Sequence, residues 1–127
     1  MSAERLFSLS VLKQPLRVSM GIYSLCLTWV SLRPSGTGGA IPHLDKVLHL
    51  IVYAVLAGGI AIAWPKLSRL SVFWVCVIFG AALEVAQGLI GTGRTASLWD
   101  GLANTLGAGL GVYAAVIIGR LFVNKAK

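Results

Sequence analysis

Polar and ionisable side chains interrupt the apolar stretches of this sequence at regular intervals. Asp45, His49 and Tyr53 are spaced by four residues, so they share one face of a helix. Glu84 and Gln87 share a face in a stretch that holds no other charged residue. Partly buried carboxylates and imidazoles are the groups that transfer protons near neutral pH. Glu84 and His49 are therefore candidate catalytic residues as general acid or base, with Asp45 as the candidate that orients His49.

A second polar set begins with Arg94 and Ser97 and continues as a helical stripe formed by Asp100 and Asn104. An arginine holds an anionic head group through charge-assisted hydrogen bonds, and the other three side chains offer hydrogen-bonding groups. Together with two residues of the first set, they make a candidate ligand-binding set of six residues: Tyr53, Gln87, Arg94, Ser97, Asp100 and Asn104.

Several of these residues have a structural alternative. Asp45, in a first helical turn, complements the helix dipole. Ser97 and Asp100 match the Ser-x-x-Asp form of a capping box that precedes an apolar run. His49 is more simply a hydrogen-bonded packing residue, and Tyr53 an aromatic residue at the membrane interface. These alternatives stay open for all five residues.

Glu84 is the residue that a structural role explains least, because a carboxylate facing lipid near the middle of a membrane costs about 2.5 to 3.5 kcal/mol. We expect it to face the bundle interior and to bond His49 and Asn104. A divalent cation bound by some of Asp45, His49, Glu84 and Asp100 is one variant of the enzyme interpretation. No HExxH motif or clustered histidine supports that variant, so we predict no metal and no cofactor.

The composition is that of a membrane protein. The chain has 127 residues, of which 57% are hydrophobic and 12% charged, and its mean hydropathy of +0.83 excludes an ordinary soluble domain. Glu84 is the one charged residue in four apolar stretches: residues 18–32, 47–65, 70–93 and 101–119. Since about 17 to 25 apolar residues span a bilayer as a helix, we predict an all-α bundle of four transmembrane helices, at about residues 16–32, 43–64, 70–90 and 100–123.

The segments outside this bundle are short. Residues 1–15 combine apolar residues with Arg5 and Lys13, which predicts a segment lying at the membrane interface. Residues 124–127 form a basic tail. A cleaved signal peptide is the alternative for the first apolar stretch, because basic residues precede it and small residues follow it.

The fourth stretch carries small residues four apart at Ala103, Gly107, Gly111 and Ala115. Such a stripe lets the backbone of another helix approach closely. Small residues that could face it lie in the second and third stretches: Ala54, Gly58, Gly59, Gly80, Ala81 and Ala82.

The distribution of basic residues predicts the orientation. With four spans, both ends of the chain and the middle loop share one side of the membrane, and that side holds eight of the eleven basic residues: Arg5, Lys13, Arg17, Lys66, Arg69, Arg120, Lys125 and Lys127. The positive-inside rule places this side in the cytoplasm. The polar residues then gather at the outer face, and the net charge of +7 reflects topology rather than nucleic-acid binding.

The ordered polar pattern resembles the VanZ-like family of bacterial membrane proteins, over roughly residues 43–120. The pattern reads Asp45-Lys46-x-x-His49-x-x-x-Tyr53, then Glu84-x-x-Gln87, then Gly93-Arg94-x-x-Ser97-x-x-Asp100-x-x-x-Asn104-x-x-Gly107-x-x-x-Gly111. The resemblance implies a location in the bacterial cytoplasmic membrane and a connection with the cell envelope. It also implies a link with low-level resistance to the glycopeptide teicoplanin, but no settled biochemical activity.

Three functions fit these observations, and whether the protein is an enzyme stays open. The first is an enzyme acting on a lipid-linked or cell-wall precursor at the outer leaflet. The second is a non-catalytic module that binds such a ligand, or a membrane protein partner, in the same pocket. The third is a small proton-coupled transporter subunit with Glu84 as the protonation site. The expected partners are the lipid bilayer, an envelope precursor and, as a further option, a second copy of the chain.

Overall fold

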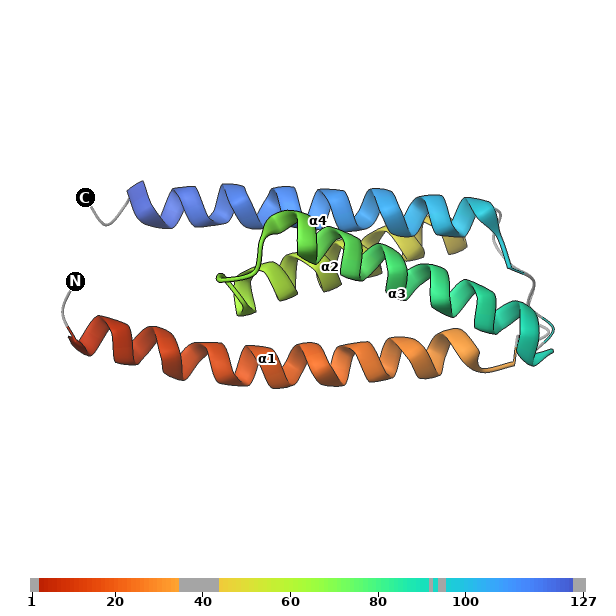
Figure 1. The fold of residues 1–127 in the computed structure, drawn as a ribbon, viewed down its shortest axis with the longest axis horizontal. Coiled ribbons are helices and arrows are strands. Elements are labelled where there is room, and N and C mark those ends of the chain that lie inside the picture. The colour runs from red at the N-terminus through yellow and green to blue at the C-terminus, as the bar shows by residue number, and fades with distance from the viewer. Residues whose placement is uncertain (1–2, 35–43, 92, 94–95, 125–127) are drawn as a thin grey trace.

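Four helices make up the part of the chain that the structure describes. The structure, a computed structural model, describes residues 3–34, 44–91, 93 and 96–124. The helices are α1 (Ala3–Leu32), α2 (Leu44–Ala63), α3 (Arg69–Ile90) and α4 (Leu98–Asn124). They run along one long axis, and the start of α1 lies at the same end of the bundle as the end of α4 (Figure 1). The predicted all-helical architecture is confirmed.

Three of these helices are long and apolar enough to cross a membrane: Leu44–Ala63, Arg69–Ile90 and Leu98–Leu121. Their outward faces carry large apolar side chains such as Ile78, Leu89 and Leu106, which are well exposed. Water would not tolerate so much exposed apolar surface, whereas lipid does. The prediction of a membrane protein is therefore supported by three helices, and α1 is not among them.

Helix α1 is longer than the sequence suggested. It runs without a break from Ala3 to Leu32 with Pro15 inside it, so residues 3–15 belong to the same helix rather than to an element of their own. The Arg17 guanidinium donates a hydrogen bond to the carbonyl of Ala63, 3.1 Å away, at the end of α2. This bond fastens α1 to α2. Among the described residues, α1 also contacts α3 but not α4.

Helices α2 and α4 form the most extensive contact of the bundle. Small residues allow it, because a Cβ added at Gly107 would meet the carbonyl of Leu50, and one added at Gly111 would meet the backbone of Ala54 and Gly58. The predicted stripe of small residues on α4 is therefore the surface that α2 packs against. Among the described residues, the core beside this contact is a cluster of eight buried residues: Tyr53, Leu56, Ala57, Ala61, Val72, Cys76, Ala108 and Ala115.

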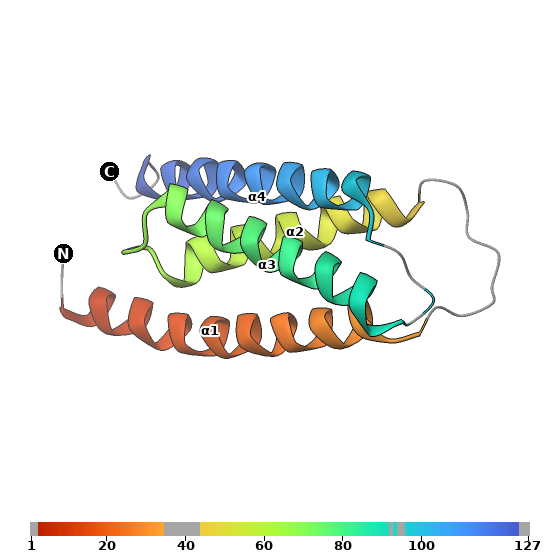
Figure 2. The ribbon, with the colours of Figure 1, turned by 45° about the vertical axis from the view of Figure 1, so that its right-hand side comes forward.

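The connections bring the polar residues to one end of the bundle. Helix α2 ends at Ala63, just before Pro65, which has no N–H to extend the hydrogen bonds of the helix. Helix α3 begins after Ser68, whose hydroxyl accepts a hydrogen bond from the amide of Ser71. Because α2 and α3 are thus antiparallel, the start of α2, the end of α3 and the start of α4 lie together (Figure 2). We call this end the polar end, defined by eight residues: Asp45, Lys46, His49, Glu84, Gln87, Ser97, Asp100 and Asn104.

Candidate functional site

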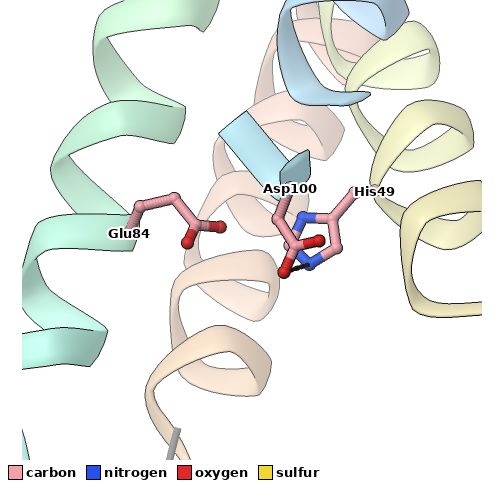
Figure 3. Close-up of side chains that lie close together, drawn as sticks. All are labelled: His49, Glu84 and Asp100. Atoms are coloured by element: carbon pink, nitrogen blue, oxygen red, sulfur yellow. Dashed lines mark ion pairs between the residues drawn. The ribbon is translucent and has the colours of Figure 1, made fainter. Parts of the chain in front are cut away.

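Three helices direct ionisable side chains toward one point at the polar end. His49 comes from α2, Glu84 from α3 and Asp100 from α4, and Figure 3 shows the three side chains turned toward one another. Each offers one nitrogen or oxygen atom, and these atoms lie within 4.8 Å of one another. Residues separated by up to 51 positions in the sequence (49 to 100) therefore meet in space, as antiparallel packing of the helices requires.

The turn before α4 explains why Asp100 can face this point. The Ser97 hydroxyl accepts a hydrogen bond from the amide of Asp100, at 3.3 Å, so Ser97 caps the helix. In a complete capping box, the Asp100 carboxylate would in turn accept from the amide of Ser97. That amide instead donates to Oε2 of Glu84, 3.1 Å away. The carboxylate of Glu84 therefore accepts the hydrogen bond that Asp100 would accept in a complete capping box. The carboxylate of Asp100 is not used in the cap and can face the site.

The orientation of His49 is set by Asn104. The Nδ1 atom of His49 lies 2.9 Å from Oδ1 of Asn104, and because this oxygen only accepts, Nδ1 donates. In the neutral ring, the lone pair then lies on Nε2, which is 4.0 Å from Oδ2 of Asp100. Glu84 was expected to bond His49 and Asn104; it bonds the amide of Ser97 instead, and those two residues bond each other.

Asp45 does not orient His49, contrary to expectation. Its carboxylate lies 2.8 Å from the ammonium of Lys46, which also lies 3.3 Å from Oδ1 of Asp100. The side chain of Asp45 is 46% exposed, whereas that of Asp100 is 15% exposed. Asp45 therefore stands at the rim of the site. Its first-turn position also lets it complement the dipole of α2.

A polar cavity of about 350 Å³ opens at this end of the bundle. Its walls come from α2, α3, α4 and the connection between α3 and α4. The lining residues are Asp45, Lys46, His49, Gln87, Gly93, Ser97 and Asp100. Five of these carry hydrogen-bonding or charged groups that sequence reasoning assigned to the site.

An apolar cavity of about 150 Å³ adjoins the polar one, between α1 and α2. Its lining residues are Leu27, Val30, Ser31, Asp45, Leu48, His49 and Val52. Asp45 and His49 line both cavities. Gln87 lines the polar cavity and Ser31 lines the apolar one. The side-chain amide of Gln87 donates a hydrogen bond to the carbonyl of Ser31, 2.9 Å away, and so connects the two walls. The two cavities are thus neighbours, one with a polar lining and one with an apolar lining.

Two further predicted residues stand apart from this arrangement. Tyr53 is buried in the core against Phe79 and lines neither of the two cavities, so the structure places it among the packing residues. Gly80 makes room for it, since a Cβ there would lie 3.0 Å from the Tyr53 ring and 3.1 Å from the Asn104 amide. Arg94 lies outside the described residues.

A comparison with protein families places most of the chain in one family. The family model described as VanZ/LLP1 matches residues 8–119, which include every residue of the polar end. The chain belongs to the VanZ/LLP1 family. No curated protein and no solved structure matches it. The VanZ/LLP1 match confirms the resemblance found over residues 43–120 and extends it through most of α1, the helix that forms one wall of the apolar cavity.

Sequence reasoning gave Lys46 no role in the site, although the family pattern includes it, and it missed the apolar cavity. Lys46 carries a recognisable signal, because a lysine in the first turn of an apolar helix needs a partner, and the acid beside it supplies one. The apolar cavity has no such signal. Its α1 residues, Leu27 and Val30, look like any other apolar residues of a membrane helix until α1 is placed against α2.

Proposed function

We propose that this VanZ/LLP1 protein binds a lipid-linked ligand of the cell envelope in the bacterial cytoplasmic membrane. The polar head of the ligand occupies the polar cavity, and its hydrocarbon chain lies in the apolar cavity. The observation that carries the proposal is that the two cavities meet at Asp45 and His49. A ligand that fills both must be amphiphilic, and a membrane is the source of such molecules.

The lining of the polar cavity favours a head group rich in hydrogen-bond donors. Asp45, Asp100 and Gln87 offer carboxylate and amide oxygens, which accept from the hydroxyl and amino groups of a sugar or peptide head. Lys46 supplies positive charge for a linking phosphate, and by its place in the sequence Arg94 does so too. A cell-wall precursor has these features. A contribution to glycopeptide resistance rests on the family resemblance alone.

The proposed topology has four spans, with α1 as the first, both termini in the cytoplasm and the polar end outside. The excess of basic residues at the termini and the middle loop supports it. The test is cysteine labelling at Gly38 and Ser68 in a background without Cys26 and Cys76. A reagent that cannot cross the membrane should label position 38 in intact cells and position 68 only after lysis. The opposite pattern would put the polar end in the cytoplasm.

Chemistry on the bound head group is the second candidate function, and the orientation of His49 favours it. With Nδ1 held by Asn104, Nε2 is aimed at the carboxylate of Asp100 rather than at a hydrogen-bond donor. An imidazole in a fixed orientation, with one ring nitrogen left for the bound head group, is suited to proton transfer. A proton-coupled transporter has no comparable observation in its favour.

A substitution that fills the apolar cavity tests the binding proposal. Leu48→Trp places a large ring in that cavity, so we expect the amount of lipid-linked ligand retained through purification to fall at least about tenfold, a loss of about 1.4 kcal/mol of binding free energy. The measurement is native mass spectrometry of the full chain, released from a mild detergent, together with identification of the extracted lipids.

Val47→Trp is the matched control. Val47 is 52% exposed and Leu48 is 51% exposed, and they are neighbours on α2, but Val47 does not line either cavity. The control variant should retain as much ligand as the wild type. Equal retention in both variants, or equal loss from both, would contradict the placement of the hydrocarbon chain between α1 and α2.

A further inference from the structure

We propose that His49, Glu84 and Asp100 bind one divalent metal ion of the zinc and manganese class. One donor atom from each residue lies within 4.8 Å of the others, and the three side chains reach the point from three different helices (Figure 3). The sequence left four residues as possible ligands, and the geometry selects these three. The inference does not need the proposed lipid ligand, because a metal ion can be bound without it.

The hydrogen bond to Asn104 prepares His49 for a metal. A histidine that ligates through one ring nitrogen nearly always donates its other N–H to an oxygen nearby, which fixes the tautomer and the ring orientation. In this site, Nδ1 donates to Oδ1 of Asn104 at 2.9 Å, and Nε2 faces the carboxylates. Asn104 is itself almost fully buried, so the arrangement is held firmly in the bundle.

The carboxylates supply a second, independent observation. Oδ1 of Asp100 is buried and makes no hydrogen bond in the part of the chain that the structure describes, although the Lys46 ammonium lies 3.3 Å away. Glu84 is only 8% exposed, and its Oε2 atom accepts a hydrogen bond from the amide of Ser97. A buried carboxylate (Glu84) and a partly buried one (Asp100) that face a nitrogen lone pair are stabilised by positive charge between them.

Lys46 does not meet this need. Its ammonium lies closer to Asp45, at 2.8 Å, than to Asp100, at 3.3 Å. Among the described side chains, the Lys46 ammonium is therefore shared between the carboxylates of Asp45 and Asp100, and no ion pair in this part of the chain reaches Glu84. A divalent cation at the centre of the three candidate ligands would balance the remaining charge.

Only a small adjustment completes the coordination. Zinc binds imidazole nitrogen and carboxylate oxygen at about 2.0 to 2.2 Å, so ligand atoms of one ion lie about 3 to 3.5 Å apart. His49 Nε2 and Asp100 Oδ2 are 4.0 Å apart, which is close to this spacing. A movement of the side-chain atoms by about 1 Å would bring them to the distance that one zinc ion requires. Three protein ligands leave one position open, as in catalytic zinc sites. A group in the polar cavity, which His49 and Asp100 line, would take that position.

Metal content of the purified chain tests the proposal. The full chain is stripped with a chelator, incubated with zinc or manganese chloride, freed of excess ion and analysed by mass spectrometry of the elements. The wild type should hold about one ion per chain. Glu84→Gln and Asp100→Asn, which keep size and most hydrogen bonding, should each hold less than about a tenth of that amount.

Asp45→Asn is the matched control, because Asp45 stands next to the site but outside the three ligands. It should keep about one ion per chain. Asn104→Ala should still bind metal but about 10 to 100 times more weakly, as substitutions beside metal ligands do, and the difference is read by titration. Zinc should also raise the melting temperature of the wild type but not that of Glu84→Gln.

The proposal would be overturned by a folded wild type that holds neither ion after loading. It would be overturned equally by a loss of metal in Asp45→Asn as large as that in Glu84→Gln. The ion would then be held by the total negative charge of the polar end and not by three specific ligands. Should Glu84→Gln fail to fold, the zinc titration of the wild type and of Asn104→Ala still decides the matter. None of these readings depends on bound lipid, so the metal and the lipid proposals fail separately.

Discussion

Gly111→Ala should lower the melting temperature of the purified protein by at least about 5 °C. A Cβ at this position would meet the backbone of Ala54 and Gly58, where no flexible side chain can move aside. Helices α2 and α4 would have to separate, and overpacking of this kind costs about 1 to 3 kcal/mol. Because this contact positions His49 against Asn104, the ligand and the metal ion should be lost as well.

Gly119→Ala is the control for this effect. It lies on the same helix, and a Cβ there would meet nothing within 4 Å. Alanine favours a helix over glycine by about 1 kcal/mol, so this variant should be as stable as the wild type or slightly more stable. Melting curves in one detergent compare the two variants directly. Equal effects of the two substitutions would mean that the close approach of α2 and α4 does not stabilise the fold.

Glu84→Gln should raise the melting temperature in the presence of a chelator, by about 3 to 6 °C. Without a metal ion, the buried carboxylate of Glu84 lies within 4.8 Å of the partly buried carboxylate of Asp100, and like charges so close together destabilise the folded state. A glutamine keeps an oxygen for the amide of Ser97 and removes the charge. Relief of about 1 kcal/mol corresponds to this shift.

Added zinc should reverse the order, because only the wild type gains from binding the ion. Asp45→Asn serves as the comparison. Asp45 is paired with Lys46 at the rim of the site, so removal of its charge should give no such gain in stability with chelator. A Glu84→Gln variant that melts well below the wild type with chelator present would contradict this prediction. It would show that the charged Glu84 side chain stabilises the folded state and does not destabilise it.

Much of this architecture could be predicted from the sequence because a membrane imposes simple rules. Apolar length fixed three of the helices closely, and Pro65 and Gly91 mark where two of them end. Antiparallel connection of these helices then requires His49, Glu84 and Asp100 to lie at one end. The stripe at Gly107 and Gly111 was recognisable because close backbone contact needs small residues.

The rest depends on contacts that no local pattern contains. The sequence offers two carboxylates that could accept a hydrogen bond from the amide of Ser97, those of Glu84 and Asp100. The amide bonds Glu84 because of the way α3 packs on α4. Tyr53 shares its stripe with His49, but one further turn along α2 takes it into the core. The length of α1 was underestimated because Pro15 and the basic residues around it suggested a boundary that the helix passes through.

Photochemical crosslinking in living cells tests the central claim most directly, which is that a lipid-linked ligand occupies the cavity between α1 and α2. A photoreactive phenylalanine analogue at Val30, which lines that cavity, is compared with one at Leu102, which is similarly exposed near the start of α4 and lines neither cavity. We predict one dominant lipid-linked species attached at position 30, and at position 102 a mixture that follows the bulk lipid composition. The same bulk mixture at both positions would contradict the claim.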